Sequence, residues 1–325
     1  MVKPEKDLDY VILKKLKEND GYTSGEELAG KLKISRQALW KHIGKLTDKG
    51  YEITATPHLG YKLTSCPDKF YPWEIQYNLS TRFIGKEIQH KEVIDSTQDL
   101  AWQLGLEGAP EGTVVFAQTQ DKGRGRIQRQ WTSPRGGIYL SLLLKPHFLP
   151  IQEVSQITLL IALGCLRGIK KATDVECSVK WPNDIYLKGK KLGGILCEMN
   201  AEMDRVHFVV AGIGINVNSK DLPSQATSLF LHLKKKLSRV EIAKRILEEI
   251  EACYCQAQRE GFSNLLKEWS QFCLLWGKRI KVKIFDKRIE GEAAGIDEKG
   301  YLLLRKDNGL IEKISAGDVV GVNVN

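Results

Sequence analysis

The stretch KGRGRIQRQWTSPRGG, residues 122–137, combines flexible backbone with fixed positive charge. Gly123 and Gly125 alternate with Arg124 and Arg126. Glycine lets backbone N–H groups approach an anion, and guanidinium groups hold phosphate or carboxylate oxygens with two hydrogen bonds. The same composition also occurs in basic surface loops and in disordered tails. Strand-like runs at 113–118 and 138–144 flank the stretch, and we therefore expect it to become ordered over a bound ligand inside a folded domain.

Length and composition set the class of the protein. The chain has 325 residues, enough for two or three domains, and its 27% charged and 42% hydrophobic residues are ordinary for a globular protein. The charged start, MVKPEKDLDY, and the short apolar run at 157–166 argue against a signal peptide and a membrane helix, so we expect a cytoplasmic protein with no membrane partner. Seven cysteines without a Cys-x-x-Cys pair argue against a disulfide framework and a zinc site.

The positive charge is concentrated in two places. The formal net charge is +9, with six Lys/Arg against one acid over 31–49 and five against one over 118–135. A basic surface attracts anionic partners. Two separate clusters indicate two different anions.

The first cluster lies in a predicted DNA-binding domain, residues 1–66. Apolar residues at helical spacing predict a helix over 8–17 and two more that Ser24 and Ser35 cap, and strand-like pieces follow at 51–55 and 61–64. Three helices and a hairpin make a winged helix-turn-helix, in which polar residues of the third helix contact DNA. The residues assigned to DNA are Ser35, Arg36, Gln37, Lys41, His42 and Lys45. The alternative is a solvated face on a structural domain.

The rest of the chain changes character after Pro67. Strand-like runs at 113–118, 138–144, 175–180, 193–199 and 206–215 alternate with helical stretches at 99–106 and 153–172, and two further helices are expected at 237–260 and 261–272. From Gly277 short strands and tight turns are typical of a small β-barrel. We therefore predict an α+β multidomain protein with a central mixed α/β domain, residues 67–275, and a C-terminal β-barrel, residues 276–325.

Two more motifs accompany the glycine-arginine loop. Residues 180–184 read KWPND, ahead of GKKLGG at 189–194, and these cations beside glycines suit a phosphate contact. Residues 212–216 read GIGIN, where small residues let a ligand or another strand come close. Alone, this last motif is equally typical of a β-bulge.

Taken in order, these pieces resemble the biotin protein ligases. The resemblance rests on residues 95–98 (DSTQ), Gln120, the loop from Gly123, and residues 180–184, 191–194 and 212–216. With the N-terminal domain, it extends to the bifunctional members that also repress the biotin operon. It implies a core like that of class II synthetases and an SH3-like C-terminal barrel. It also implies that biotin and ATP, with Mg²⁺, give biotinyl-5′-AMP, and that biotin then passes to a lysine of a biotin carboxyl carrier domain.

The resemblance also implies roles for individual residues. The biotin-binding set is Ser96, Thr97, Gln98, Gln120, Gly123, Arg124, Gly125, Arg126 and Lys191. The set for ATP and the adenylate is Arg124, Arg126, Trp131, Asn183, Lys191 and Asn216, with Arg126 and Lys191 as the catalytic cations and Asp184 as a Mg²⁺ ligand. Simpler roles stay open: Ser96 as a helix cap, Trp131 as a buried structural residue and Asp184 as a turn cap. Arg129 and Arg135 have no assigned role.

The resemblance further implies a homodimer that forms when the adenylate is bound and places two winged helices on operator DNA. Two other functions remain open. One is a lipoate ligase or another acyl-adenylate-forming ligase on the same core. The other is a repressor that senses a ligand without catalysing a reaction.

Overall fold

The computed structural model describes residues 8–202 and 205–323. The chain divides into two compact units, residues 1–69 and 70–325. Within the described residues no helix is long and apolar enough to cross a membrane. The seven cysteines, all in the described part, form no disulfide.

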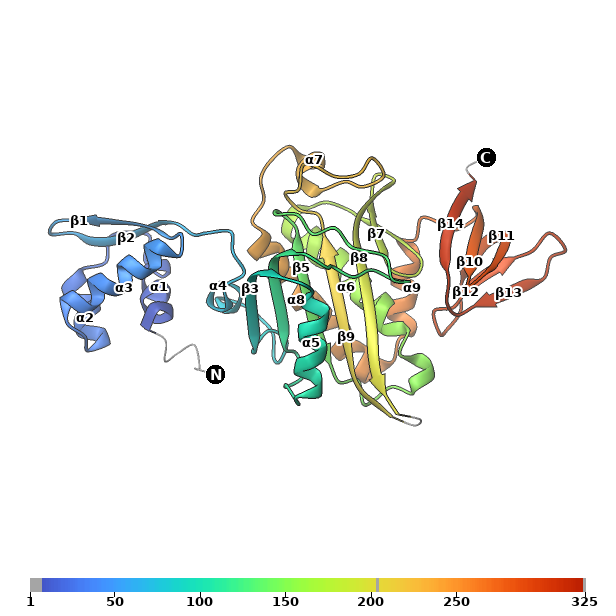
Figure 1. Ribbon diagram of the computed structural model, residues 1–325, viewed down its shortest axis with the longest axis horizontal. Coiled ribbons are helices and arrows are strands. Elements are labelled where there is room, and N and C mark those ends of the chain that lie inside the picture. The colour runs from blue at the N-terminus through green and yellow to red at the C-terminus, as the bar shows by residue number, and fades with distance from the viewer. Residues whose placement is uncertain (1–7, 203–204, 324–325) are drawn as a thin grey trace. The chain divides into compact units, whose positions relative to one another are not determined.

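The first unit contains three helices and a β-hairpin (Figure 1). Its elements are α1 (Leu8–Lys17), α2 (Gly25–Leu32), α3 (Arg36–Asp48), β1 (Glu52–Thr56) and β2 (Gly60–Ser65). Ser24 and Ser35 begin α2 and α3, since their side-chain oxygens accept hydrogen bonds from the backbone N–H groups of Glu27 and Ala38. The apolar positions that predicted these helices form the core, which includes Ile12, Leu13, Leu16, Leu28, Leu39, Ile43 and Leu46. The winged helix-turn-helix is thus present.

A seven-stranded sheet organises the second unit. Its strands are β3 (Ile88–Ile94), β4 (Val114–Gln120), β5 (Ile138–Leu144), β6 (Ser178–Lys180), β7 (Asp184–Leu187), β8 (Lys190–Ala201) and β9 (Val206–Ile215). The order across the sheet is β3-β4-β5-β9-β8-β7-β6. Only the β3–β4 pairing is parallel among those that the structure describes. The longest strands, β8 and β9, therefore lie side by side near the middle.

Helices cover the two faces of this sheet unequally (Figure 1). One face packs against α6 (Gln156–Thr173) and α8 (Arg239–Glu260) and builds the main core, while α5 (Thr97–Leu106) lies on the other. Strand alternation explains how one strand serves both sides: Leu140 and Leu142 of β5 enter the main core, whereas Leu143 packs under α5. The short helices α4 (Pro72–Gln76), α7 (Leu229–Leu233) and α9 (Ser263–Gln271) complete this part.

The chain ends in a five-stranded antiparallel sheet. Its strands are β10 (Arg279–Ile284), β11 (Lys287–Ile296), β12 (Leu302–Arg305), β13 (Ile311–Ile314) and β14 (Asp318–Asn323), in the order β13-β12-β11-β10-β14. The expected β-rich C-terminal region is therefore confirmed. It contacts the central part directly, because the indole N–H of Trp181 donates to the carbonyl of Gly300 at 3.1 Å.

Several elements differ from the sequence-based expectation. The strand expected at 175–180 is formed only at its end, and the helix expected from 153 begins at Gln156 after a single 3₁₀ turn, Ile151–Glu153. Strands β3 and β7 were not predicted from the sequence. Strand β3, IQHKEVI, is only half-buried and carries several polar side chains, so it lacks the apolar run of a central strand.

Candidate ligand-binding site

A cavity of about 140 Å³ opens where residues 122–137 cross strands β8 and β9. It lies on the face of the sheet that also carries α5. The predicted ligand residues that line it are Thr97, Gln98, Gln120, Arg124, Gly125, Arg126, Trp131, Asn183, Asp184 and Lys191. Ser96, Gly123 and Asn216 do not line it. Predicted residues from five separate stretches of sequence are therefore brought to one place.

The N-terminus of α5 supplies one polar wall. Ser96 caps the helix, since its Oγ accepts from the N–H of Asp99 at 3.3 Å. The N–H and Oγ1 of Thr97 donate to Gln120 Oε1 at 2.8 and 3.0 Å. Gln120 Nε2 in turn donates to Ser133 Oγ at 2.9 Å, within the loop. Helix α5, strand β4 and the loop are thus joined by one amide group.

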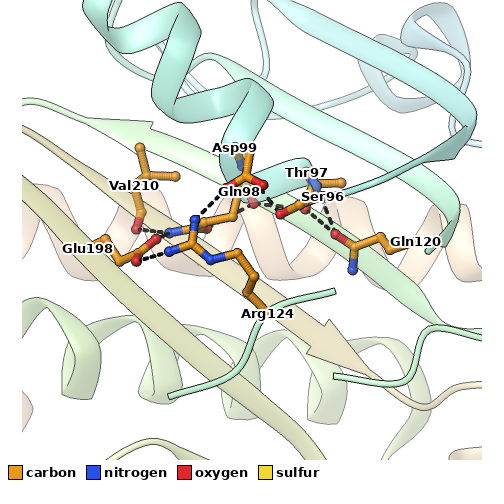
Figure 2. Close-up of polar contacts among 9 residues, drawn as sticks. Ser96, Thr97, Gln98, Asp99, Gln120, Arg124, Glu198 and Val210 are labelled. Atoms are coloured by element: carbon orange, nitrogen blue, oxygen red, sulfur yellow. Dashed lines mark hydrogen bonds and ion pairs between the residues drawn. The ribbon is translucent and has the colours of Figure 1, made fainter. Parts of the chain in front are cut away.

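The side-chain amide of Gln98 is the second amide of this polar wall (Figure 2). Gln98 is 3% exposed and its Nε2 donates to Glu198 Oε2 and to the Val210 carbonyl, both at 3.0 Å. Its Oε1 accepts from Ser141 Oγ at 3.1 Å. Figure 2 also shows the Arg124 guanidinium between Asp99 and Glu198, with which it forms ion pairs. Ser141 and Glu198 were not predicted, because no motif surrounds either of them.

The glycine-arginine loop is ordered over this wall. The N–H of Trp131 donates to the Gly123 carbonyl at 2.8 Å, and the N–H of Gly125 donates to the Arg129 carbonyl at 2.7 Å. A Cβ at Gly123 would collide with the Trp131 carbonyl, which explains that glycine. Ile127, at the tip, has a positive φ of 53°, a conformation that costs free energy for a β-branched residue.

Trp131 closes the cavity against the sheet. A Cβ at Gly214 would lie 2.5 Å from Trp131 Nε1, and one at Gly194 would lie 3.2 Å from its Cζ3, so the indole rests on bare backbone. Lys191 Nζ is 5.4 Å from the centre of the ring. Trp131 Nε1 is buried and has no hydrogen-bond partner among the described residues. A buried donor of this kind indicates that an acceptor of a ligand or water belongs there.

Cations gather at the other end of the cavity. Arg126 donates to Asn183 Oδ1 at 3.1 Å and to the Gly317 carbonyl at 3.3 Å, and its guanidinium is also 3.3 Å from Asp318 Oδ1. Arg129, which had no predicted role, also pairs with Asp318. The C-terminal sheet therefore contributes a carboxylate to the site, which the sequence did not reveal.

Two lysines complete this cationic end. Lys191 Nζ lies 2.7 Å from Asp184 Oδ1. Burial disfavours the charged form of Lys180 and lowers the pKa of its ammonium group below the usual value. Among the described residues that line the cavity there is no cysteine, and the one serine, Ser141, hydrogen-bonds to Gln98 and Thr97 rather than to a general base, so this lining does not suggest a covalent intermediate with the protein. The arrangement instead suits electrostatic stabilisation of phosphate groups.

Asn216 has a structural role in this conformation. It is 4% exposed, its Nδ2 donates to the Thr227 carbonyl at 3.1 Å, and its carbonyl accepts from the N–H of Leu229. It fastens the segment before α7 to the end of β9. The backbone N–H of Lys191 donates to the Gln225 carbonyl of the same segment at 3.0 Å. Asn216 therefore lies next to the cavity without lining it.

Metal ligands are few in this region. Within the described residues no three His, Cys, Asp or Glu side chains cluster closely enough to hold a metal ion. Two carboxylates line the cavity: Asp184, which pairs with Lys191, and Asp318, which pairs with Arg126 and Arg129. Mg²⁺ at nucleotide sites is commonly held by one or two carboxylates together with substrate phosphates. Asp184, at the cationic end of the cavity, fits that pattern.

In the first unit, the exposed face of α3 matches most of the residues assigned to DNA. Ser35, Arg36, Gln37, Lys41 and Lys45 are exposed. His42 is partly buried, and its Nδ1 lies 2.7 Å from Asp9 Oδ1 of α1. Trp40, 67% exposed on the same helix, was not among the residues predicted to contact DNA. An exposed tryptophan beside basic residues fits a nucleic-acid-binding face.

Comparisons with known proteins cover all three regions. Residues 91–216 match the biotin/lipoate A/B protein ligase family, residues 10–62 an HTH domain and residues 276–320 the biotin protein ligase C-terminal domain. The chain is 39% identical to the bifunctional ligase/repressor BirA of Bacillus subtilis over 92% of this chain and 93% of that protein. It is 31% identical to the bifunctional ligase/repressor BirA of Escherichia coli over 93% of both chains.

Solved structures agree with these sequence matches. The biotin protein ligase from Aquifex aeolicus, in complex with biotin and ATP, superposes with a TM-score of 0.63 at 30% identity. The match covers 71% of this chain and 97% of that one.

Proposed function

The chain belongs to the biotin protein ligase family, among the bifunctional ligase/repressors, and on that premise we propose how its own residues carry out the reaction. It is a biotin protein ligase that carries a DNA-binding repressor domain. In the proposed sequence the biotin carboxylate attacks the α-phosphorus of ATP, biotinyl-5′-AMP forms and pyrophosphate leaves. The lysine amine of a biotin carboxyl carrier domain then attacks the acyl carbon, an amide forms and AMP leaves.

The observation that carries this proposal is the polarity of the cavity. One end presents neutral amides and hydroxyls, from Gln98, Gln120 and Thr97, and the other presents Arg126 and Lys191. A ligand with an uncharged polar ring at one end and phosphate groups at the other matches both. Biotinyl-5′-AMP is such a ligand, with the ureido ring beside the amides and the phosphate beside the cations.

Catalysis in this site is electrostatic. Negative charge gathers on the α-phosphate as the carboxylate attacks, and Arg126 and Lys191 stabilise it from fixed positions. Mg²⁺, when bound with ATP at Asp184, supplies further positive charge to the phosphates. Arg124 contacts the carboxylate end, and the Trp131 indole covers the nucleotide. Because a mixed anhydride hydrolyses readily in open water, a loop that shields the intermediate preserves it for transfer.

Ligand entry requires the loop to move. Sites for small molecules usually enclose about 300–1,000 Å³. The 140 Å³ cavity is smaller, and Trp131, Arg124, Arg126 and Arg129 of the loop line it. The closed loop therefore represents a covered state that opens to admit biotin and ATP and closes again over the adenylate.

For repression, we propose that α3 enters the major groove of operator DNA. Arg36 and Gln37, at the exposed start of the helix, suit base edges, and Lys41 and Lys45 suit phosphates. A two-fold operator requires two such domains, so we propose a homodimer that forms when the adenylate is bound. We place both activities in the cytoplasm, where carrier domains and DNA are both accessible.

Exchange of labelled pyrophosphate into ATP tests the ligase assignment. We expect exchange with biotin and none with lipoate, and biotin transfer to a carrier domain only when ATP is present. Exchange with lipoate alone would favour the other ligase class, and no exchange with either would favour a ligand-sensing repressor. Operator binding should strengthen with biotin plus ATP and weaken steeply with salt. Equal binding by a protein that begins at Pro67 would overturn the role of the first domain.

A further inference from the structure

Four side chains of the cavity form a hydrogen-bond chain that begins at a carboxylate. Gln98 Nε2 donates to Glu198 Oε2 and to the Val210 carbonyl. A carboxylate and a carbonyl oxygen accept hydrogen bonds only, so both N–H bonds of the Gln98 amide point towards them. Its Oε1 consequently faces the bare backbone of Gly212, where a Cβ would lie 2.6 Å away. The orientation of the Gln98 amide is therefore fixed by Glu198 and the Val210 carbonyl, neither of which lines the cavity.

The direction of the next bonds follows from the count of protons. Ser141 is fully buried and its single hydroxyl proton goes to Gln98 Oε1. In its contact with Thr97 Oγ1, at 2.9 Å, Ser141 therefore has no proton to donate. The hydroxyl group of Thr97 has a single proton and two acceptors within reach, Ser141 Oγ and Gln120 Oε1. Whichever acceptor receives this proton, Thr97 Oγ1 has no other proton to donate. Towards the cavity, Gln98 Oε1 and Thr97 Oγ1 thus offer lone pairs and no proton.

We propose that Glu198 is a positioning residue that sets this donor direction and thereby makes the cavity selective for a ring bearing two N–H groups. The inference rests on the proposed function, because the cyclic urea of biotin carries two such groups. A ring oxygen in place of either N–H would set lone pair against lone pair, which costs both the hydrogen bond and the desolvation of a buried acceptor. Glu198 acts through Gln98 and does not itself line the cavity.

Glu198 has a second contact that an experiment must separate from the first. It shares Arg124 with Asp99, so its loss also weakens the hold on the loop. Glu198→Gln keeps the shape of the side chain but brings an N–H group that can face Gln98, so only the Val210 carbonyl still requires an N–H from the Gln98 amide. Asp99→Asn is the matched control: it removes the other carboxylate partner of Arg124 and leaves the chain from Glu198 to Thr97 intact.

The test compares biotin with two analogues in which one or the other ureido N–H is replaced by a ring oxygen. For each variant, kcat/KM in pyrophosphate exchange is measured with all three compounds, and thermal melting confirms that the variant is folded. We expect Glu198→Gln to lower the preference for biotin over at least one analogue by about tenfold, mainly through KM, the size expected for one hydrogen bond. We expect Asp99→Asn to preserve the wild-type preference.

Two results would overturn the inference. One is a folded Glu198→Gln protein with the wild-type preference. The other is an Asp99→Asn protein whose preference falls as far, because the effect would then come from Arg124. Absence of exchange by the wild-type protein with biotin would instead overturn the proposed function, so the two failures are distinguishable.

Discussion

Adding one methyl group at Gly214 should prevent the loop from closing while leaving the sheet in place. Gly214 lies in β9 and pairs with Tyr139 and Gly194, and its φ lies outside the positive range, so alanine suits its backbone. A Cβ there would lie 2.5 Å from Trp131 Nε1 and 2.6 Å from Cε2. Real Cβ atoms do not approach so closely, so the indole must leave its position.

The size of the effect follows from what the indole loses. Burial of a large apolar side chain stabilises a structure by about 1.5–3 kcal/mol. Taking about 2 kcal/mol for the partly covered indole, the ratio of closed to open loop falls roughly thirtyfold at about 1.4 kcal/mol per factor of ten. We therefore expect biotinyl-5′-AMP to dissociate from Gly214→Ala roughly thirtyfold faster, in proportion to that ratio.

Two measurements check this prediction. Dissociation of preformed, labelled adenylate gives the release rate, and limited trypsin digestion after Arg126 and Arg129 reports loop opening. Gly194→Ala is a graded control, because its Cβ would lie 3.2 Å from Trp131 Cζ3 and needs only a small adjustment. A Gly214→Ala protein that is folded yet retains adenylate as the wild type does would refute the reasoning. So would a larger effect at Gly194.

The remaining predictions concern three other charged side chains, those of Asp318, Arg239 and Asp9. Asp318→Asn should raise trypsin cleavage after Arg126 and Arg129 about tenfold, because charge-assisted bonds are worth about 1.5–3 kcal/mol and both arginines share this carboxylate; unchanged digestion would contradict it. Arg239→Leu should lower the free energy of unfolding by about 2–4 kcal/mol in denaturant titrations, because it leaves the Gly137 carbonyl and Gln118 Oε1 buried without their donor. Burial alone would raise the pKa of Asp9, but Lys49 and His42 outweigh it and hold that pKa below the ordinary 3.8. Its stabilisation is therefore present above about pH 4 and is lost as the pH falls through the lower folded pKa, so Asp9→Asn and wild type should differ in stability at neutral pH and converge in acid.

The fold was largely predictable where local pattern and burial agree. Strands β5 and β9 and helix α1 have the predicted bounds, because each combines a strong apolar pattern with clear turn or cap residues. Strand β3 was missed because it lies at the edge of the sheet beside β4 and needs little apolar surface. Its position is decided by tertiary pairing, which a single sequence does not display.

The site was predictable only where residues form compact motifs. The loop from Gly123, the turn at Asn183 and Asp184, and Lys191 all lie in short runs of glycine and charge, and all of these segments line the cavity. Glu198 and Asp318 occur in ordinary strand sequences, ILCEMN and GDVV. Their importance comes from the partners across the fold, Gln98 and the loop arginines, to which neither has any fixed spacing in sequence.

The loop arginines and their carboxylates also determine how the loop opens. Arg124 pairs with Asp99 and Glu198 at a place where its side chain is 43% exposed, and exposed pairs stabilise by at most about 1 kcal/mol. Asp318, which receives Arg126 and Arg129, is only 11% exposed, so its pairs are less screened by water. The Arg124 end should therefore release first and let biotin reach the amide wall, while the Arg126 end stays near the phosphate positions. The carboxylate or phosphate of an incoming ligand then competes with the protein carboxylates for arginine side chains that are already in place. Ligand binding therefore exchanges one ion-pair partner of each arginine for another and does not require the loop to fold anew.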